Sequence, residues 1–270
     1  MRKILSTLVI VVCTVIFCLS SYKLYDIWTD YKEIGEVYDS VESTYTQKYA
    51  TEAASASEAE KTEKEIQKEE EKEPDPPLSV DWAGLKNRNP DVVGWVYIDA
   101  TQASYPIVQG EDNQEYLHKA LDGRYLFAGC IFLSAGNEPD FSDANSIVYG
   151  HHMKDGSMFG LNRRLKDQAT YDANPYFWIL TPEGNYRYRI YSVAVAEPNS
   201  DPYILWKTGG AEFLEWEKKL QKMSLVKNDV KLTEDDHTVI LSCCEAKGNN
   251  RTLVAGICCS KQQPPTKTEE

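Results

Sequence analysis

Histidine is scarce in this chain, with four residues among 270, and basic residues (29) are outnumbered by acidic ones (42). The net charge of −13 argues against a nucleic-acid partner, although part of it comes from one local acidic run. The absence of Cys-x-x-Cys weighs against a thioredoxin-like redox role, and the absence of paired Cys-x-x-Cys or His-x-x-x-His weighs against structural zinc. A hydrophobic content of 42% instead predicts one packed domain with accessory segments.

One long uncharged run lies near the N-terminus. Eighteen residues, Ile4–Ser21, follow Arg2 and Lys3 and are enough to span a bilayer. Positive charge stays on the cytoplasmic side, so the chain after Tyr22 is expected to face outward. A cleaved signal peptide is the competing interpretation, but no Ala-x-Ala-like site follows the run, which favours an uncleaved anchor.

The next segment changes composition sharply. Aromatic and charged residues over 22–41 predict a juxtamembrane helix, whereas 42–75 carry eleven acidic and five basic side chains and predict a solvated spacer, helical at most in patches. The expected organisation is a cytoplasmic tip and membrane anchor (1–21), a juxtamembrane segment and charged linker (22–77), a folded domain (78–261) and a polar tail (262–270).

The sequence of this domain predicts a mainly β fold. Short apolar runs bounded by Gly, Pro, Asn or Asp predict strands at 92–98, 105–108, 129–133, 146–149, 176–180, 186–196, 238–242 and 253–258. Eight such strands commonly close into a barrel, which removes exposed edges. Helices are predicted at 82–90 and 211–223. The second is amphipathic, with Phe213, Leu214, Trp216, Leu220 and Met223 near one face and a Glu215–Lys219 pair.

Two strand ends carry reactive side chains. Thr238–Cys244 is a β-branched run that ends in a thiol, and Ser146–Met153 places His151 just after Gly150. A cysteine nucleophile needs a side chain that accepts and donates protons close to its thiol in the folded protein, and these two strand ends could provide the pair. By contrast, His118 lies in a stretch that looks like an exposed helix.

Five cysteines follow the apolar run, so at least one is unpaired if the others pair within the chain. Adjacent cysteines are poor mutual disulfide partners. Cys130, Cys258 and Cys259 are interpreted as small apolar residues on strands.

Four motifs together resemble the sortases, and class B sortases in particular. They are Asn89–Trp95, Tyr105–Gly110, Ile147–Phe159 (Ile-Val-Tyr-Gly-His-His-Met-Lys-Asp-Gly-Ser-Met-Phe) and Val239–Cys244 followed by Arg251. The resemblance implies an eight-stranded sortase-type β-barrel with a helix before the cysteine-bearing strand, where Ala211–Met223 fits. It also implies a membrane-anchored cysteine transpeptidase of the thiol-endopeptidase class on a Gram-positive cell surface, with no metal or organic cofactor.

Carried onto this sequence, the family's catalytic residues are Cys244, His151 and Arg251. The family's Leu-Ser-Thr-Cys is Leu-Ser-Cys-Cys here, and counting back from Arg251 would favour Cys243 instead. Neighbouring strand residues point to opposite faces, so only one thiol can face the cleft, and alignment on Leu-Ser-x-Cys gives Cys244.

The implied reaction cleaves a C-terminal sorting motif of surface proteins or pilins through a thioacyl-enzyme. The acyl group then passes to an amine of peptidoglycan or a pilin. The protein is expected at the cell membrane, single-pass, with its catalytic domain outside. Two alternatives stay open: a cysteine protease with water as acceptor, and a non-catalytic surface binding domain with a Cys243–Cys244 disulfide. The motif, the acceptor and the protonation state of the thiol–imidazole pair are also open.

Overall fold

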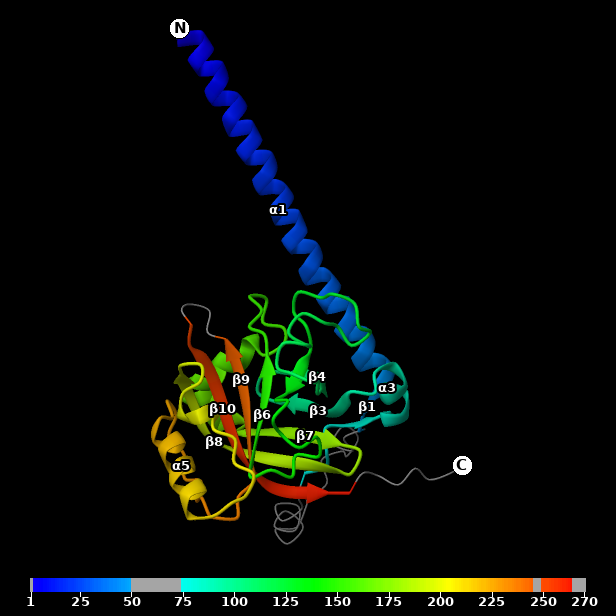
Figure 1. Cartoon of the computed structure of the whole chain (residues 1–270), viewed down its shortest axis with the longest axis vertical. Coiled ribbons are helices and arrows are strands. Elements are labelled where there is room, and N and C mark those ends of the chain that lie inside the picture. Colours follow the sequence, from blue (N-terminus) through cyan, green and yellow to red (C-terminus); the bar gives the residue numbers. More distant parts are fainter. Residues whose placement is uncertain (1, 50–73, 245–248, 264–270) are drawn as a thin grey trace, which may run out of the picture. The chain divides into compact units, whose positions relative to one another are not determined.

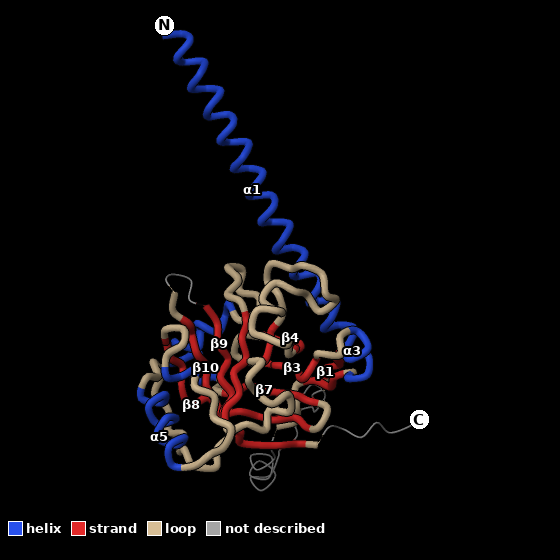
Figure 2. Tube along the Cα trace, viewed as in Figure 1, coloured by secondary structure: helices blue, strands red, loops and turns tan. Residues whose placement is uncertain are grey.

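A computed structural model of the chain describes residues 2–49, 74–244 and 249–263 (Figures 1 and 2). The chain divides into two compact units, Met1–Ser40 and Val41–Glu270. Most of the predicted acidic spacer (50–73) and of the polar tail (264–270) lies outside the described residues, and the four-part organisation stays a prediction.

The first unit holds most of helix α1, which begins at Arg2 and ends at Tyr45. The predicted apolar run lies within it. Among the described helices, this is the one that is long and apolar enough to cross a membrane by length and composition. Apolar side chains on it are exposed, with Ile10 at 63% and Phe17 at 70%. The helix is therefore a candidate membrane span.

The second unit is a closed eight-stranded β-barrel, as the strand pattern predicted, with neighbours in the order β10-β8-β7-β3-β4-β5-β6-β9. Its strands are β3 (Val92–Ile98), β4 (Ala103–Val108), β5 (Ile131–Leu133), β6 (Asn145–Gly150), β7 (Tyr176–Thr181), β8 (Gly184–Ala196), β9 (Thr238–Cys244) and β10 (Arg251–Gln262). The short helices are α3 (Trp82–Arg88), η2 (Gly160–Lys166), α4 (Gln168–Ala173) and η3 (Asp201–Tyr203).

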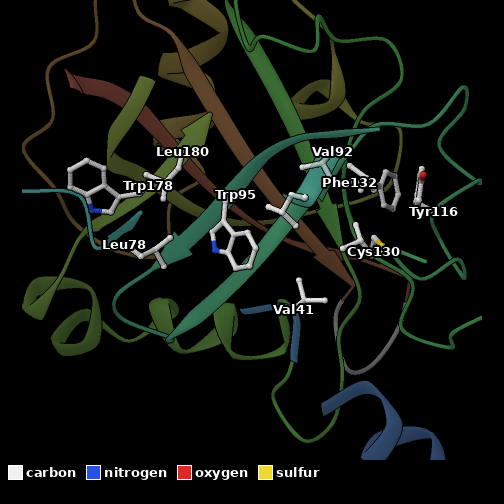
Figure 3. Packing of buried hydrophobic residues seen from close by; sticks show 12 residues of the cluster. Val41, Leu78, Val92, Trp95, Tyr116, Cys130, Phe132, Trp178 and Leu180 are labelled. Atoms are coloured by element: carbon white, nitrogen blue, oxygen red, sulfur yellow. The ribbon is translucent and has the colours of Figure 1, made fainter. Parts of the chain in front are cut away.

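One core cluster is centred on Trp95 of β3. Its side chain is fully buried, and its indole N–H donates to the Ser104 hydroxyl at 3.1 Å on the neighbouring strand β4. Figure 3 shows Leu78 and Leu180 in the same cluster. A buried tryptophan with its one polar atom satisfied contributes several kcal/mol of packing, and it ties β3 to both of its neighbours.

Helix α5 (Ala211–Lys222) covers one face of the barrel. Phe213, Trp216 and Leu220 are buried with apolar residues of β9 and β10 in a second cluster, as the amphipathic pattern predicted. Leu214 and Met223 do not belong to this face, since Leu214 is only partly buried and Met223 is 40% exposed. Leu214 is turned about 100° from its neighbour Phe213, and Met223 lies at the C-cap beyond the last turn.

The polar side of α5 also differs from the prediction. Glu215 pairs with Lys218 at 2.8 Å, one residue earlier than the expected Lys219. Both spacings bring side chains together on a helix, so the pattern did not decide between them. Glu217 is fully buried and accepts a hydrogen bond from the Thr238 hydroxyl of β9.

A small sheet precedes the barrel and was not predicted. Strand β1 (Thr46–Lys48) pairs antiparallel with β2 (Leu78–Val80). The composition of 42–75 predicts a solvated spacer, but α1 continues to Tyr45 and β1 follows it directly. Three-residue strands carry too little periodicity to be recognised, and this pairing joins segments about thirty residues apart.

Candidate active site

The backbone brings the three predicted site positions into one row. Strands β6 and β9 run parallel and side by side (Figure 1), with Gly150 opposite Cys243. In that register the next residues, His151 and Cys244, are also adjacent. Strand β10 is antiparallel to β9 and places Arg251 opposite Cys244. Neighbouring strands lie about 4.8 Å apart, so the row spans about 10 Å.

Glycine at position 150 allows β6 to reach this point. A Cβ there would lie 2.5 Å from Ile131 Cδ1 and 2.6 Å from Phe159 Cδ2, closer than real Cβ contacts. The tight packing fixes the strand end just before His151. In the Gly-His pair, the packing around position 150 therefore requires glycine, and the next residue, His151, lines the cleft.

A cleft of about 310 Å³ opens beside the row. It is lined by Asn113, Gln114, Leu117, Phe132, Tyr149, Gly150, His151, Pro198, Asn199, Tyr203, Ser242 and Arg251. Cys244 is the last residue of β9, and its side chain lies outside what the structure describes. Ser242 and Cys243 are both buried, but only Ser242 lines the cleft, so strand alternation places position 244 on the face of Ser242.

The His151 ring is held by one hydrogen bond and two ring contacts. Its Nε2 lies 2.8 Å from the Leu117 carbonyl oxygen. A carbonyl can only accept, so we assign the proton to Nε2, which leaves the lone pair of the neutral ring on Nδ1. The ring stacks against His118, with centroids 5.3 Å apart, and against Phe127 at 6.3 Å.

Burial lowers the pKa of His151, because the charged ring is poorly solvated there. The charges of His118 and Arg251 act in the same direction, while the bond to the Leu117 carbonyl acts against them. The neutral ring is thus favoured at neutral pH.

The expected helix around His118 is absent, although the residue is exposed as predicted. At the start of this segment, the Asp112 carboxylate accepts hydrogen bonds from the backbone N–H groups of Gln114 and Glu115, and these bonds compete with helix formation. Further on, carbonyls that a helix would use bond elsewhere: the Leu117 oxygen bonds His151, and the His118 oxygen accepts from Leu126. The segment forms turns that bring His118 beside His151, which the sequence did not indicate.

Arg251 enters the cleft from the start of β10. Its Nη1 donates to the carbonyl of Asn249 at 2.8 Å and to that of Asn250 at 3.3 Å. Both bonds use one nitrogen of a group with five N–H donors. They hold the guanidinium at the cleft wall.

Aromatic side chains form another wall of the cleft. Tyr149 stacks with Phe132 at 5.3 Å and with Tyr203 at 6.4 Å, and the Tyr203 hydroxyl lies 2.9 Å from Ser242 Oγ. Burial raises the pKa of Tyr149 to about 12, so this wall is uncharged. Tyr149 lies inside the Tyr-Gly-His motif, whereas no pattern in the sequence marked Tyr203.

The remaining cysteines only partly match their prediction. Cys130 is buried, one residue before β5. Cys258 and Cys259 lie on β10, but Cys259 is exposed, because β10 is irregular between Cys258 and Ser260. Burial raises the pKa of Cys258 to about 11, so its thiol stays protonated and is a poor nucleophile. Within the described residues, no group of three or more His, Cys, Asp or Glu side chains could hold a metal ion.

Comparison with known proteins gives a matching family model and similar curated proteins. The family model described as Sortase domain matches residues 96–257. Sortase B of Listeria monocytogenes is 37% identical over 166 residues, and sortase B of Staphylococcus aureus is 28% identical over 162 residues. Each alignment covers 60% of this chain and 66% of the relative, so the chain spans slightly less than two thirds of the curated relatives it matches.

Solved structures extend the likeness to the fold. A sortase B structure from B. anthracis has a TM-score of 0.68 and 26% identity, covering 86% of this chain and 98% of that one. Sortase B of Clostridium perfringens has a TM-score of 0.62 and 27% identity, covering 66% of this chain and 99% of that one.

Proposed function

Because this chain belongs to the sortase family, and to class B within it, we propose that it is a cysteine transpeptidase of the cell surface. It cleaves a C-terminal sorting motif of surface proteins or pilins and transfers them to an amine of peptidoglycan or a pilin. The observation that carries this proposal is the single row formed by His151, Cys244 and Arg251 across β6, β9 and β10.

The chemistry follows from these residue types. The Cys244 thiol gives its proton to His151, and its sulfur attacks the carbonyl carbon of the scissile peptide bond. The C–N bond breaks, the leaving amine takes the proton from His151, and the acyl group stays on sulfur as a thioester. An acceptor amine then attacks the thioester, gives a proton to His151, and a new amide forms as the thiol is regenerated.

The surroundings of His151 support its role as the base. A lowered pKa keeps the ring neutral in the free enzyme, and the bond to Leu117 leaves Nδ1 as the atom that accepts the proton. These two observations favour a neutral thiol and imidazole before substrate binds.

Arg251 supports the reaction without exchanging protons. A guanidinium stays charged at every relevant pH, so its role is to donate hydrogen bonds to the substrate carbonyl or to the oxyanion. The bonds from Nη1 to the loop carbonyls fix its plane beforehand, which reduces the entropy lost when substrate binds.

The anchor completes the proposal. α1 holds the enzyme in the cell membrane as a single-pass protein, with the barrel outside. Its length and composition support a span, and Arg2 and Lys3 support the orientation. The mature protein then keeps its first residues and fractionates with membranes. A mature N-terminus near residue 22, found by sequencing, contradicts the anchor.

The test of the activity uses the full chain and a sorting-motif peptide library of Asn-Pro-x-Thr-x and Leu-Pro-x-Thr-x sequences. Cys244→Ala abolishes cleavage and acyl-enzyme formation. The matched variant Cys243→Thr is tolerated, since threonine is β-branched and suits a strand. Mass spectrometry of the trapped acyl-enzyme reads the outcome. An adduct that survives Cys244→Ala and vanishes in Cys243→Thr assigns the nucleophile to Cys243.

A second arm of the test separates transfer from hydrolysis. An added amine raises the yield of ligated product if the enzyme is a transpeptidase. Product that contains only the hydrolysed acid, whatever the amine concentration, instead assigns a cysteine protease. Titration of free thiols in the resting protein addresses the third alternative, a disulfide between Cys243 and Cys244.

A further inference from the structure

A second hollow, of about 400 Å³, lies on the barrel and shares no lining residue with the cleft. Strands β7, β8 and β10 and residues 229–231 enclose it. Three cationic side chains line it, Arg187, Arg189 and Lys231, against one carboxylate, Asp229. In a chain with a net charge of −13, such a local excess of positive charge is unusual.

The barrel register places these groups together. Arg187 and Arg189 are two residues apart on β8 and so share a face. On β7, Trp178 is opposite Arg187 and Tyr176 is opposite Arg189. The Arg187 guanidinium lies 3.7 Å from the centroid of the Tyr176 ring, so it stacks on that ring and its plane is fixed.

The two arginines differ in their hydrogen bonds. Arg189 donates to the Tyr176 hydroxyl at 2.8 Å and pairs with Asp229 at 3.2 Å. Arg187 has no carboxylate partner among the residues that the structure describes, whereas the Nε atoms of both arginines are buried without a hydrogen-bond acceptor. A guanidinium that lies against a ring and has no carboxylate partner is suited to bind an oxyanion through its terminal Nη groups.

We propose that this hollow binds a phosphate group, with phosphate oxygens on the Nη groups of Arg187 and with Arg189 and Lys231 nearby. Cations approach from two segments, β8 and 229–231, which suits a tetrahedral anion better than a planar carboxylate. Small-molecule pockets run from about 300 to 1,000 Å³. A hollow of about 400 Å³ therefore holds a phosphate together with part of the molecule that carries it.

Phosphate groups at a cell surface come from soluble phosphodiester polymers or from lipid headgroups. The experiment uses the full chain in a neutral detergent and measures ³¹P line broadening. Its probes are inorganic phosphate, a glycerol-phosphate oligomer and a short-chain phosphatidylglycerol below its micelle concentration. Tighter binding of the oligomer identifies a polymer as the source, and tighter binding of the lipid identifies a headgroup.

Arg187→Gln is expected to weaken phosphate binding by about tenfold, the loss typical for a charged hydrogen bond. Arg124→Gln is the matched control, because it removes the same charge from an exposed arginine paired with Asp122, and it leaves binding within about twofold. Lys231→Gln, at an exposed position, is expected to weaken phosphate binding less than Arg187→Gln does. It replaces Arg187→Gln in the test if that variant fails to fold.

Transpeptidation with a short peptide stays unchanged in both hollow variants, so the result is independent of the proposed catalytic function. The proposal is overturned if the unaltered protein binds no phosphate. It is equally overturned if Arg124→Gln weakens binding as much as Arg187→Gln, since the effect is then general charge attraction.

Discussion

Glu217 makes the stability of the α5–barrel contact depend on pH. The side chain is fully buried, its Oε1 accepts from Thr238, and its Oε2 has no hydrogen-bond partner. Burial raises its pKa from 4.5 to about 8, aided by the charge of Asp236 and opposed by the bond from Thr238. The protonated carboxyl is therefore the form that the folded protein favours at neutral pH.

The direction in which stability changes with pH follows from the number of protons that the folded and unfolded states bind. Below the ordinary pKa of 4.5, the folded and unfolded states both hold the proton, and burial of the charge costs nothing. Above it the unfolded chain releases the proton while the folded protein keeps it, so stability falls by about 1.4 kcal/mol per pH unit. The fall ends near the folded pKa of about 8. The total is about 5 kcal/mol, an order-of-magnitude figure for a single group.

Glu217→Gln keeps the shape of the side chain and removes this titration. Urea unfolding of both proteins from about pH 5 to about pH 8 is expected to show that the variant gains stability relative to the unaltered protein as pH rises. Glu215→Gln, in an exposed pair with Lys218, is the matched control and leaves the pH dependence unchanged. Parallel curves for Glu217→Gln and the unaltered protein over this range would refute the reasoning.

Three further predictions concern the cleft. Arg251→Lys keeps the charge but loses the forked donor geometry, so most transpeptidation activity is expected to be lost while the thermal unfolding midpoint is retained. Near-normal turnover would show that Arg251 has no role in the reaction. His118→Phe keeps a ring against His151 but removes a neighbouring charge, so NMR titration shows a raised His151 pKa; an unchanged or lower value contradicts this. Gly129→Ala lowers the unfolding midpoint more than Gly123→Ala, because both have positive φ but only the Gly129 Cβ meets backbone carbonyls; equal losses contradict the packing argument.

The barrel was predictable because its strands are long enough to show a pattern. The run Val92–Ile98 is β-branched and aromatic, follows Asn-Pro, and is observed with the predicted bounds. β8 begins at Gly184, two residues earlier than expected, because a turn residue also pairs in the ladder. β1 could not be predicted, since three residues in an acidic region acquire strand structure only from their distant partner.

The cleft was predictable only where a residue ends a strand. His151 and Arg251 line it because β6 and β10 deliver them there, and a reader of the sequence can find both strand ends. Tyr203, the last residue of η3, and His118, in a run of turns, reach the same region from outside the strands. Their positions depend on hydrogen bonds between residues far apart in sequence, such as Tyr203 with Ser242, and no local pattern encodes such bonds.

The two adjacent thiols show how the strand register bears on a choice that sequence spacing leaves open. Counting residues back from Arg251 favours Cys243, but counting cannot tell which face of a strand a residue occupies. Ser242 lines the cleft and contacts Tyr203, so the next residue, Cys243, belongs to the opposite face and is not among the residues that line the cleft. A buried thiol there would reach a substrate carbonyl only if β9 slipped by one residue. Such a slip would also break the observed register of β9 with β6 and β10. The packing of β9 therefore supports Cys244 as the nucleophile.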